Sequence, residues 1–272
     1  ISDPPRAEVG AAIAEAEKAG IRTVMITGDN ELTAYAIARH INLMKEGDEV
    51  ITGIQFASMS HEERRARLPR IRVFARITPE QKLEIVRLLQ GEGHVVAVTG
   101  DGVNDALALK QANVGIAMGI TGTDVAKEAA DMIITDDNYA TIVSAVEEGR
   151  VIYENMKASI KYLVGSNIGE ILALLIGTIL GWPFILLPIQ ILYINLVTDG
   201  LPALALALNH KHHNIMGRAP RTEKELFTKY DIRWLAEVSI LTAVATLVAF
   251  WIGWRENNLP LARTLAFVVI AL

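Results

Sequence analysis

The amino-acid sequence predicts an α/β domain built on a mostly parallel sheet, followed by an α-helical transmembrane bundle. Helix-type and strand-type patterns alternate through the first half of the chain, which is the order expected of strands joined by covering helices. From Ile160 onward, three apolar stretches are long enough to cross a bilayer core, which needs about 20 residues, and a fourth reaches the chain end. Charged residues concentrate ahead of these stretches, so we expect two domains, 1–150 and 151–272.

Apolar spacing and end signals place the elements of the first domain. Thr78 followed by Pro79 is typical of a helix start, with Thr as the N-cap and Pro in the first turn. Short β-branched runs that end near Gly or Thr predict strands. We expect helices over 8–19, 31–41, 78–90 and 105–110, and strands over 22–26, 73–75, 94–99, 114–117 and 132–134.

The second domain is predicted to cross a lipid bilayer several times. From Tyr139 a helical pattern continues into the first apolar stretch without a Gly-Pro break, so one continuous helix is expected there. The spans are predicted over 160–180, 184–208 and 234–254, with another starting near 265. The loop after the second span is basic, through Lys211, Arg218, Arg221, Lys224, Lys229 and Arg233. The positive-inside rule then places this loop and the first domain in the cytoplasm.

Composition excludes several classes of function. The net charge of −5, without a basic stripe, gives no indication of a nucleic-acid partner. The absence of cysteine excludes disulfides and thiolate chemistry within this chain. The polar start carries no cleavable signal. Because the chain begins without Met and ends inside an apolar run, we expect it to be a piece of a longer protein.

A first candidate site lies where the 94–99 strand ends. Asp101, Asn104 and Asp105 follow this strand and precede a helix, the position at which open α/β sheets bind ligands. Clustered carboxylates need a counter-charge, and oxygen ligands suit a hard divalent ion, so we expect Mg²⁺ beside a phosphate. The alternative is an Asp-rich turn that only caps a helix.

A second strand end and a lysine complete the candidate phosphate site. Thr27, Gly28 and Asp29 follow the 22–26 strand, and a hydroxyl with backbone N–H groups at a helix start can hold a phosphoryl group. Lys82, near the start of the 78–90 helix, can neutralise a phosphoryl oxygen. An ordinary turn and a solvated lysine are the alternatives.

The membrane half contains oxygen-bearing side chains at helical spacing, namely Asn167, Glu170, Asn195, Thr198 and Asp199. An ionised carboxylate at the bilayer centre costs about 2.5–3.5 kcal/mol on insertion scales, and ligation of a cation would compensate for it. The alternative is a hydrogen-bonded helix interface. Gly165 and Gly169 would allow helix backbones to approach, and Gly200 with Pro202 is expected to loosen the second span. Five oxygen-bearing side chains suit Ca²⁺, which takes roughly 6–8 oxygen ligands, but they do not exclude Na⁺.

Together these motifs resemble the phosphorylation domain of P-type ATPases, which belongs to the haloacid-dehalogenase-like superfamily with its Rossmann-like parallel sheet. The resemblance rests on 3–6 (Asp-Pro-Pro-Arg), 27–30 (Thr-Gly-Asp-Asn), 78–82 (Thr-Pro-Glu-Gln-Lys) and 99–105 (Thr-Gly-Asp-Gly-Val-Asn-Asp), in the family's order. It implies ATP as the phosphoryl donor and Mg²⁺ as the metal. One departure is Leu107, where the family usually has Pro.

The resemblance also implies roles for the candidate residues. Thr27 and Gly28, with Asp29 beside them, would contact the phosphoryl group, and Lys82 would offset its charge. Asp101 would bind Mg²⁺, while Asn104 and Asp105 would support phosphate and metal.

No aspartate in the chain is followed by Lys-Thr-Gly, the family's phosphorylated motif. By the resemblance, that nucleophile lies upstream with the nucleotide and actuator domains and the first four spans. The membrane part would then hold the fifth to seventh spans and the start of the eighth. We expect this chain alone to be inactive, so that γ-labelled ATP leaves no acid-stable label on it.

The motifs around the membrane oxygens resemble those of type II calcium pumps. They are 166–170 (Ser-Asn-Ile-Gly-Glu), 195–202 (Asn-Leu-Val-Thr-Asp-Gly-Leu-Pro) and the later 215–221. The resemblance implies Ca²⁺ transport across a prokaryotic plasma membrane or an internal eukaryotic membrane. The alternatives are a pump for another cation, such as Na⁺ or Mn²⁺, a non-catalytic membrane scaffold derived from a pump, and a membrane-tethered phosphatase.

Overall fold

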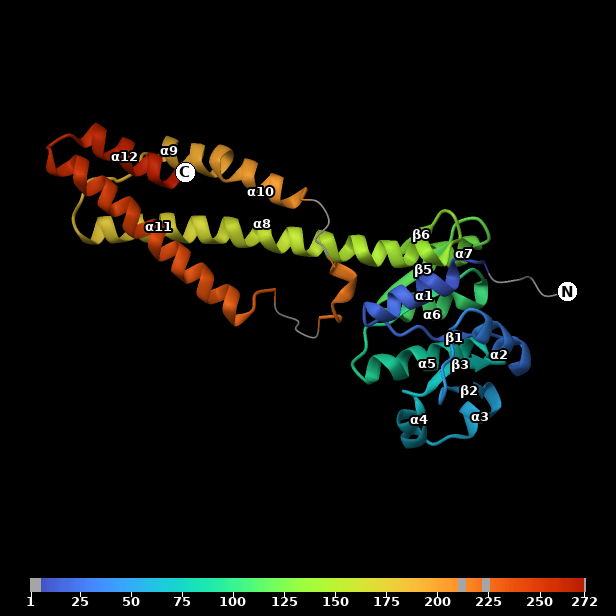
Figure 1. The fold of residues 1–272 in the computed structure, drawn as a ribbon. Coiled ribbons are helices and arrows are strands. Elements are labelled where there is room, and N and C mark those ends of the chain that lie inside the picture. The colour runs from blue at the N-terminus through green and yellow to red at the C-terminus, as the bar shows by residue number, and fades with distance from the viewer. Residues whose placement is uncertain (1–5, 210–213, 222–225, 272) are drawn as a thin grey trace. The chain divides into compact units, whose positions relative to one another are not determined.

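The computed structural model describes residues 6–209, 214–221 and 226–271 (Figure 1). The chain divides into two compact units: Ile1–Glu147 with Asn214–Pro220, and Glu148–His213 with Arg221–Leu272. The motif at 3–6 lies outside the described residues except for Arg6, and so do Lys211 and Lys224 of the basic loop.

The first unit contains two parallel three-stranded sheets. One has the order β1 (Met25–Ile26), β3 (Ile71–Ala75), β2 (Glu49–Thr52), and the other has the order β4 (Ala97–Gly100), β5 (Val114–Met118), β6 (Met132–Ile134). All four strand pairings are parallel, as the alternating pattern predicts. β1 and β4 are therefore edge strands, and each is followed at once by one of the two candidate motifs.

Helices connect and cover these strands. They are α1 (Val9–Lys18), α2 (Glu31–His40), α3 (Gly53–Ser58), α4 (His61–Arg67), α5 (Pro79–Gly91), α6 (Ala106–Gln111) and α7 (Asp124–Ala129), with 3₁₀ turns at Val103–Asp105 and Ile215–Gly217. The helix predicted over 105–110 thus begins as a 3₁₀ turn that carries Asn104 and Asp105.

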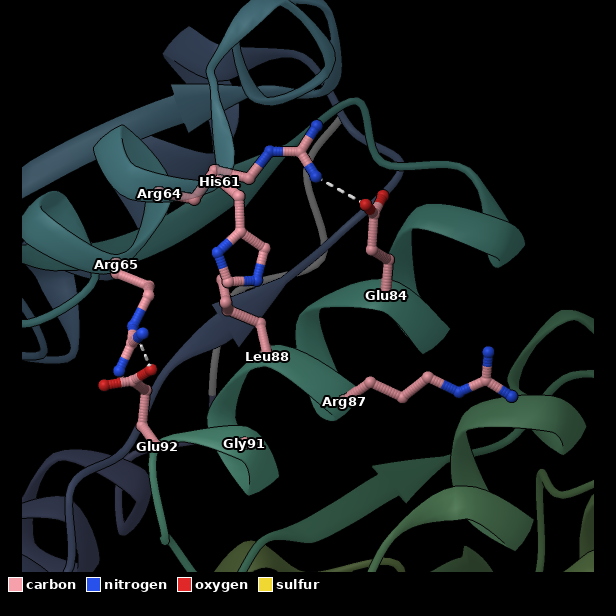
Figure 2. A pocket seen from close by; sticks show the side chains of 8 residues that line it. All are labelled: His61, Arg64, Arg65, Glu84, Arg87, Leu88, Gly91 and Glu92. Atoms are coloured by element: carbon pink, nitrogen blue, oxygen red, sulfur yellow. Dashed lines mark hydrogen bonds and ion pairs between the residues drawn. The ribbon is translucent and has the colours of Figure 1, made fainter.

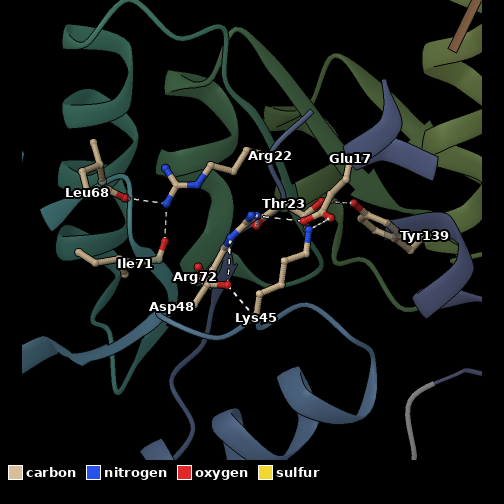
Figure 3. A network of polar contacts seen from close by, with 9 residues as sticks. All are labelled: Glu17, Arg22, Thr23, Lys45, Asp48, Leu68, Ile71, Arg72 and Tyr139. Carbon is tan, nitrogen blue, oxygen red and sulfur yellow. Dashed lines mark hydrogen bonds and ion pairs between the residues drawn. The ribbon is translucent and has the colours of Figure 1, made fainter. Parts of the chain in front are cut away.

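β1 is shorter than the strand predicted over 22–26, and arginine side chains make the bonds of the segment ahead of it. Arg72 donates to the Thr23 carbonyl at 3.2 Å, and the Arg22 guanidinium donates to the carbonyls of Leu68 and Ile71 at 2.6 and 2.5 Å (Figure 3). Glu17 pairs with Arg72 at 3.3 Å in the same network. Ahead of β1, the Thr23 carbonyl is thus bonded to a side chain instead of to a neighbouring strand.

β4 likewise begins later than predicted, at Ala97 rather than His94. The Val96 N–H donates to the side-chain oxygen of Asn113 at 2.9 Å, so this residue bonds to a side chain before the strand ladder begins.

β2, α3, α4 and α7 were not predicted, although the sequence contains signals for two of them. Thr52 with Gln55 and Ser60 with Glu63 form capping boxes at the starts of α3 and α4. Ser/Thr followed three residues later by Glu/Gln is the usual sequence signature of such a box.

α5 packs against the cores of both sheets. Ile85 lies in the cluster around Phe56 and Phe74, while Val86 lies in the cluster around Val96 and partly buried Val98. The start of α5, which carries Lys82, is thereby positioned beside the segment that follows β4.

The second unit is helical. α8 (Tyr139–Ile179) is one continuous helix of 41 residues, as predicted. It is followed by α9 (Pro188–Tyr193), a π-helical turn (Ile194–Thr198), α10 (Gly200–Ala207), α11 (Lys229–Arg255) and α12 (Leu259–Ala271). Three helical segments of the described chain are long and apolar enough to cross a membrane: Tyr139–Ile179, Pro188–Ala207 and Lys229–Arg255.

The second span begins at Pro188, four residues later than predicted. Pro188 occupies the first turn of α9, where its missing N–H has no cost, and the Gln190 side chain accepts a bond from the Leu187 N–H at 2.8 Å. The preceding Trp182 stacks on Phe250 with ring centroids 5.5 Å apart, which anchors the connection to α11.

Gly165 and Gly169 of α8 face α11, where they permit close packing as predicted. A Cβ atom at Gly169 would lie 3.0 Å from the Thr242 Cβ, and one at Gly165 would lie 3.4 Å from Leu235. The Ser239 hydroxyl donates to the Gly165 carbonyl at 2.9 Å across this interface.

Candidate functional site

The turn after β4 is organised around the buried carboxylate of Asp105. Its Oδ2 atom accepts bonds from the N–H groups of Asp101 and Gly102, each at 3.1 Å. Gly100 leaves the necessary space, since a Cβ there would lie 2.4 Å from the Asp105 Cβ. Asp105 bonds to residues that precede it and does not cap α6. The Asp105 side chain therefore stabilises the turn itself, which argues against the alternative of a turn that only caps a helix.

Lys82 forms an ion pair with Asp105 and is not the solvated lysine of the alternative interpretation. The capping box of Thr78 and Gln81 fixes the start of α5 and so the position of Lys82. Burial alone would raise the pKa of the Asp105 carboxyl. The Lys82 ammonium and the N–H groups of Gly102 and Asp101 outweigh burial and hold that pKa below its ordinary value.

Asp101 and Asn104 are exposed at the same turn. Within the described part of the chain, neither side chain makes a hydrogen bond. The Asp101 backbone is bonded on both sides, since its N–H donates to Asp105 Oδ2 and its carbonyl accepts from the Thr123 N–H at 2.8 Å. Their oxygens are therefore available to a ligand, while Asp105 and Lys82 stabilise the turn through the buried ion pair and the bonds to its N–H groups. Exposed carboxylate and amide oxygens suit a hard cation such as Mg²⁺.

The Thr27 loop is attached to the end of β3. The Thr27 N–H donates to the Phe74 carbonyl at 2.9 Å, and the Asp29 N–H donates to the Thr27 hydroxyl oxygen at 3.1 Å. Asn30 caps α2 through the Leu32 N–H. These are the bonds of an ordinary turn, but the surface at Gly28 is open, because a Cβ there would meet no atom within 4 Å.

The two strand-end motifs are not joined directly. Among the described residues, no hydrogen bond or ion pair connects Thr27, Gly28 or Asp29 with Lys82 or Asp105.

In the second unit the structure brings Glu170 and Asp199 together. They are only 3 % and 2 % exposed, and they lie near enough to interact electrostatically. The Ser166 hydroxyl donates to Asp199 Oδ1 at 3.1 Å. Glu170 Oε1 and Asp199 Oδ2 have no hydrogen-bond partner among the described residues. Buried oxygens without a donor are what a cation site requires.

The helix beside Asp199 is interrupted, as Gly200 and Pro202 predict. The Asp199 N–H donates to the Ile194 carbonyl at 2.9 Å, which closes a wide π-helical turn. Pro202 has no N–H for the carbonyl four residues earlier, and the Tyr162 hydroxyl donates to that Thr198 carbonyl at 3.4 Å. π-turns inside α-helices occur frequently at functional sites.

The other three predicted ligands, Asn167, Asn195 and Thr198, bond within their own helical segments. The amide groups of Asn167 and Asn195 and the Thr198 hydroxyl donate to the carbonyls four residues before them, at 2.8, 3.0 and 2.9 Å. Asn195 is exposed, whereas Asn167 and Thr198 are half-buried. No group of three or more His, Cys, Asp or Glu forms a metal cluster in the described residues. Of the predicted ligands, the two that the structure buries close to each other are Glu170 and Asp199.

Sequence reasoning missed the roles of Ser166 and Tyr162. Ser166 lies four residues before Glu170 on one face of α8, which was a usable signal. Nothing in the sequence points from Tyr162 to the Thr198 carbonyl, because that bond depends on how two helices cross.

A shallow groove of about 250 Å³ between α4 and α5 is not a candidate site (Figure 2). None of its lining residues was predicted to be functional. Four of its charged side chains are paired within the groove, since Arg64 pairs with Glu84 and Arg65 pairs with Glu92. Arg64 also lies over the Phe56 ring, 4.2 Å from its centroid, so it supports the core.

Comparison with known protein families agrees with both units. A family model described as haloacid dehalogenase-like hydrolase matches residues 1–113, and another with the same description matches residues 83–146. A model described as cation transporting ATPase, C-terminus, matches residues 183–272.

Similar curated proteins are calcium-transporting ATPases. The Bacillus subtilis calcium-transporting ATPase is 50% identical over 275 residues, which cover 100% of this chain and 31% of that protein. Calcium-transporting ATPase 1 of Lactococcus lactis is 46% identical, over 99% of this chain and 31% of its own length. The endoplasmic reticulum-type calcium-transporting ATPase 4 of Arabidopsis thaliana is 46% identical, over 95% and 25%. This chain spans about a third of the length of its bacterial relatives. It belongs to the P-type cation-transporting ATPases.

Proposed function

We propose that, within a full-length protein, this chain forms a C-terminal part of an ATP-driven Ca²⁺ pump that works through an aspartyl-phosphate intermediate. The observation that carries the proposal is the Glu170–Asp199 pair, with one unpartnered oxygen on each acid. Each ionised carboxylate costs about 2.5–3.5 kcal/mol in a membrane, and two close together also repel each other. A bound divalent cation would offset both costs.

At the phosphoryl site, the exposed oxygens of Asp101 and Asn104 would hold Mg²⁺, whose charge would offset that of the phosphoryl group. Asp105 would hold the turn in place through its bonds to the two preceding N–H groups. Lys82, kept near the turn by its pair with Asp105, would contribute positive charge beside the phosphoryl oxygens. Thr27 and Gly28 would receive the phosphoryl group on the open surface of their loop.

The nucleophile would come from the preceding part of the full-length pump, which would also supply ATP binding and the first four spans. Two free sheet edges support this proposal. β1 and β4 are each paired on one side only among the described strands, and each leads into a candidate motif. A further segment that lies beside them would bring an upstream aspartate to both motifs.

The protein is a multi-pass membrane protein by its family and its three membrane-length helices. We propose a cytoplasmic location for the first unit and the basic loop, on the positive-inside rule. The membrane would be the plasma membrane of a prokaryote or an internal eukaryotic membrane, since relatives of similar identity include both bacterial and endoplasmic reticulum-type pumps.

The deciding experiment is cation-dependent phosphorylation of a full-length protein that contains this chain. Asp199→Ala should abolish Ca²⁺-dependent phosphorylation by ATP, because the variant removes half of the acid pair. Glu237→Gln, which changes an exposed carboxylate on α11, is the matched control and should leave Ca²⁺ activation unchanged.

The same assay separates the competing functions. Activation by Na⁺ or Mn²⁺ in place of Ca²⁺ would identify a pump for another cation. Phosphorylation without any cation requirement would favour a phosphatase-like enzyme, and absence of phosphorylation would favour a scaffold. Unchanged Ca²⁺ activation in Asp199→Ala would refute the assigned site.

A further inference from the structure

α8 has two adjacent faces with different partners inside the second unit. One face repeats every four residues and contacts α11 through Lys157, Lys161, Gly165 and Gly169. The other face bonds to the π-helical turn through Tyr162 and to Asp199 through Ser166, and it carries the buried Glu170 within electrostatic range of Asp199. Neighbouring residues on a helix are separated by about 100° of rotation. The two faces are therefore one residue apart, and the rotation of α8 decides which side chains face Asp199.

The first of these faces ends in a cluster of opposite charges, which we call the Asp231 cluster: Lys157, Lys161, Thr228 and Asp231. Lys157 lies 2.7 Å from Asp231 Oδ2 and Lys161 lies 2.9 Å from Oδ1. The Thr228 N–H and hydroxyl donate to Oδ2 at 3.0 and 2.8 Å. Both carboxylate oxygens are thus fully engaged, and Asp231 is 6 % exposed.

The Asp231 cluster fixes α8 at two successive turns. The two lysines are four residues apart and both bond to the Asp231 carboxylate. This arrangement resists rotation of α8 about its axis and also movement of α8 along α11. Lys161 is held further by Trp234, whose ring centroid lies 4.3 Å from its ammonium. Loss of Asp231 would leave two partly buried ammonium groups without a counter-charge, which is strongly unfavourable.

We propose that Asp231 is a positioning residue, which sets the rotation of α8 so that Ser166 and Glu170 face Asp199. Both carboxylate oxygens are already bonded to Lys157, Lys161 and Thr228, so Asp231 acts by holding α8 against α11 and not as a cation ligand. This inference deepens the proposed function, since the acids that it orients are those of the proposed cation site.

The direct test is cross-linking between α8 and α10. Ser159→Cys with Ala203→Cys introduces a reporter pair at a contact where the Ser159 hydroxyl donates to the Ala203 carbonyl at 2.9 Å. This chain contributes no other cysteine, and any cysteines elsewhere in the full-length protein are first replaced by serine. In the full-length protein in membranes, Asp231→Asn should lower the yield with a short thiol cross-linker by about threefold or more. Asp231→Glu, which retains the charge, should restore most of it.

A matched control comes from the same helix. Glu237 pairs with Arg233 at 2.8 Å, and both side chains are exposed at 61 % and 80 %. Glu237→Gln removes one carboxylate from α11 without touching α8, so the cross-linking yield should stay at the wild-type level. A yield in Asp231→Asn equal to that of wild type, or lowered to the same extent by Glu237→Gln, would overturn the proposal.

A second measurement distinguishes this inference from the proposed function. In Asp231→Asn, the Ca²⁺ concentration for half-maximal phosphorylation should rise by about threefold or more, with the maximum retained. If the wild type shows no Ca²⁺ activation, the proposed function fails, but the cross-linking result still decides the role of Asp231. If Asp231→Asn does not reach the membrane, Lys161→Gln replaces it. The same fall in yield then supports the proposal, and an unchanged yield contradicts it.

Discussion

At the scale of single residues, Asp105 and Asp199 are two buried carboxylates with different surroundings. Asp105 is bonded to Lys82 and to two backbone N–H groups, so the protein itself offsets its charge. Asp199 receives a bond from Ser166 at one oxygen and has no partner at the other. A satisfied carboxylate supports the fold, whereas an unsatisfied one beside Glu170 is suited to a ligand.

Lys82→Gln should destabilise the turn after β4, because it leaves the buried Asp105 carboxylate without its counter-charge. The expected loss is about 1–3 kcal/mol of local stability. Hydrogen–deuterium exchange of the β4 and α6 amides should accelerate by about tenfold or more. Lys110→Gln, an exposed position on α6, is the control and should exchange at the wild-type rate. Equal protection in Lys82→Gln and wild type would contradict the role of the ion pair.

Gly28→Ala should impair phosphorylation without affecting stability. The added Cβ meets no protein atom within 4 Å, so the fold tolerates it, but it occupies the surface proposed for the phosphoryl group. Phosphorylation of the full-length protein should fall by about tenfold or more, the usual order for loss of one transition-state contact. Gly91→Ala, which is equally open at the end of α5, is the matched control. Full activity in Gly28→Ala would place the phosphoryl group elsewhere.

At the scale of elements, the turn after β4 requires a glycine at position 100, because the Asp105 side chain packs against it too closely for any Cβ atom. Gly100→Ala would place a Cβ 2.4 Å from the Asp105 Cβ, whereas the same change at Gly102 gives an ordinary contact of 3.7 Å with Asp105 Oδ2. Gly100→Ala should cost about 1–3 kcal/mol through overpacking, and Gly102→Ala much less. Denaturant unfolding of both variants measures the difference. Similar losses in the two would show that backbone freedom, not the Asp105 contact, requires glycine at position 100.

The loop after β5 should have its own pH dependence, through Asp137. Burial tends to raise the pKa of this carboxyl, but the N–H groups of Ile120 and Thr121 and the Thr121 hydroxyl lower it to about 2. An unfolded aspartate has a pKa of about 3.9, so Asp137 stabilises the loop fully above that value and loses this contribution as the pH falls toward 2.

Exchange of the Ile120 and Thr121 amides as a function of pH measures this contribution. After correction for intrinsic rates, protection should be constant near neutrality and decline only below about pH 4. Asp137→Asn should remove that decline. Loss of protection already at pH 6 in the wild type would show that another group controls the loop.

The helices and strands differ in how well sequence patterns predict their existence and their ends. Long helices such as α5 and α8 could be predicted from apolar period and capping, because their signals are local. The short strands could not be bounded, since side chains of Arg72 and Asn113 replace strand partners at their ends. α3 and α4 were predictable from their capping boxes. No local pattern reveals that Lys82 reaches Asp105, 23 residues away, because this depends on how α5 lies across the unit.

At the scale of the whole molecule, the chain combines a haloacid dehalogenase-like domain with a unit of membrane-length helices, and α8 is one uninterrupted helix that contributes residues to both. Both candidate sites lie on elements whose ends or faces could be recognised from sequence. The burial of their carboxylates, Asp105 in one site and Glu170 with Asp199 in the other, could not, because it depends on the fold. In the proposed pump, phosphorylation at the first unit would be coupled to the exposure of the acid pair in the second, and α8 is the continuous element that serves both.

The most direct test of this account is equilibrium binding of Ca²⁺ to the full-length protein in detergent, compared with Glu170→Gln. We predict saturable Ca²⁺ binding by the wild type that is lost, or weakened by about tenfold or more, in the variant, because half of the buried acid pair is neutralised. Glu237→Gln serves as the control with unchanged binding. The account is contradicted if the wild type binds no Ca²⁺, or if Glu170→Gln binds it as tightly as the wild type.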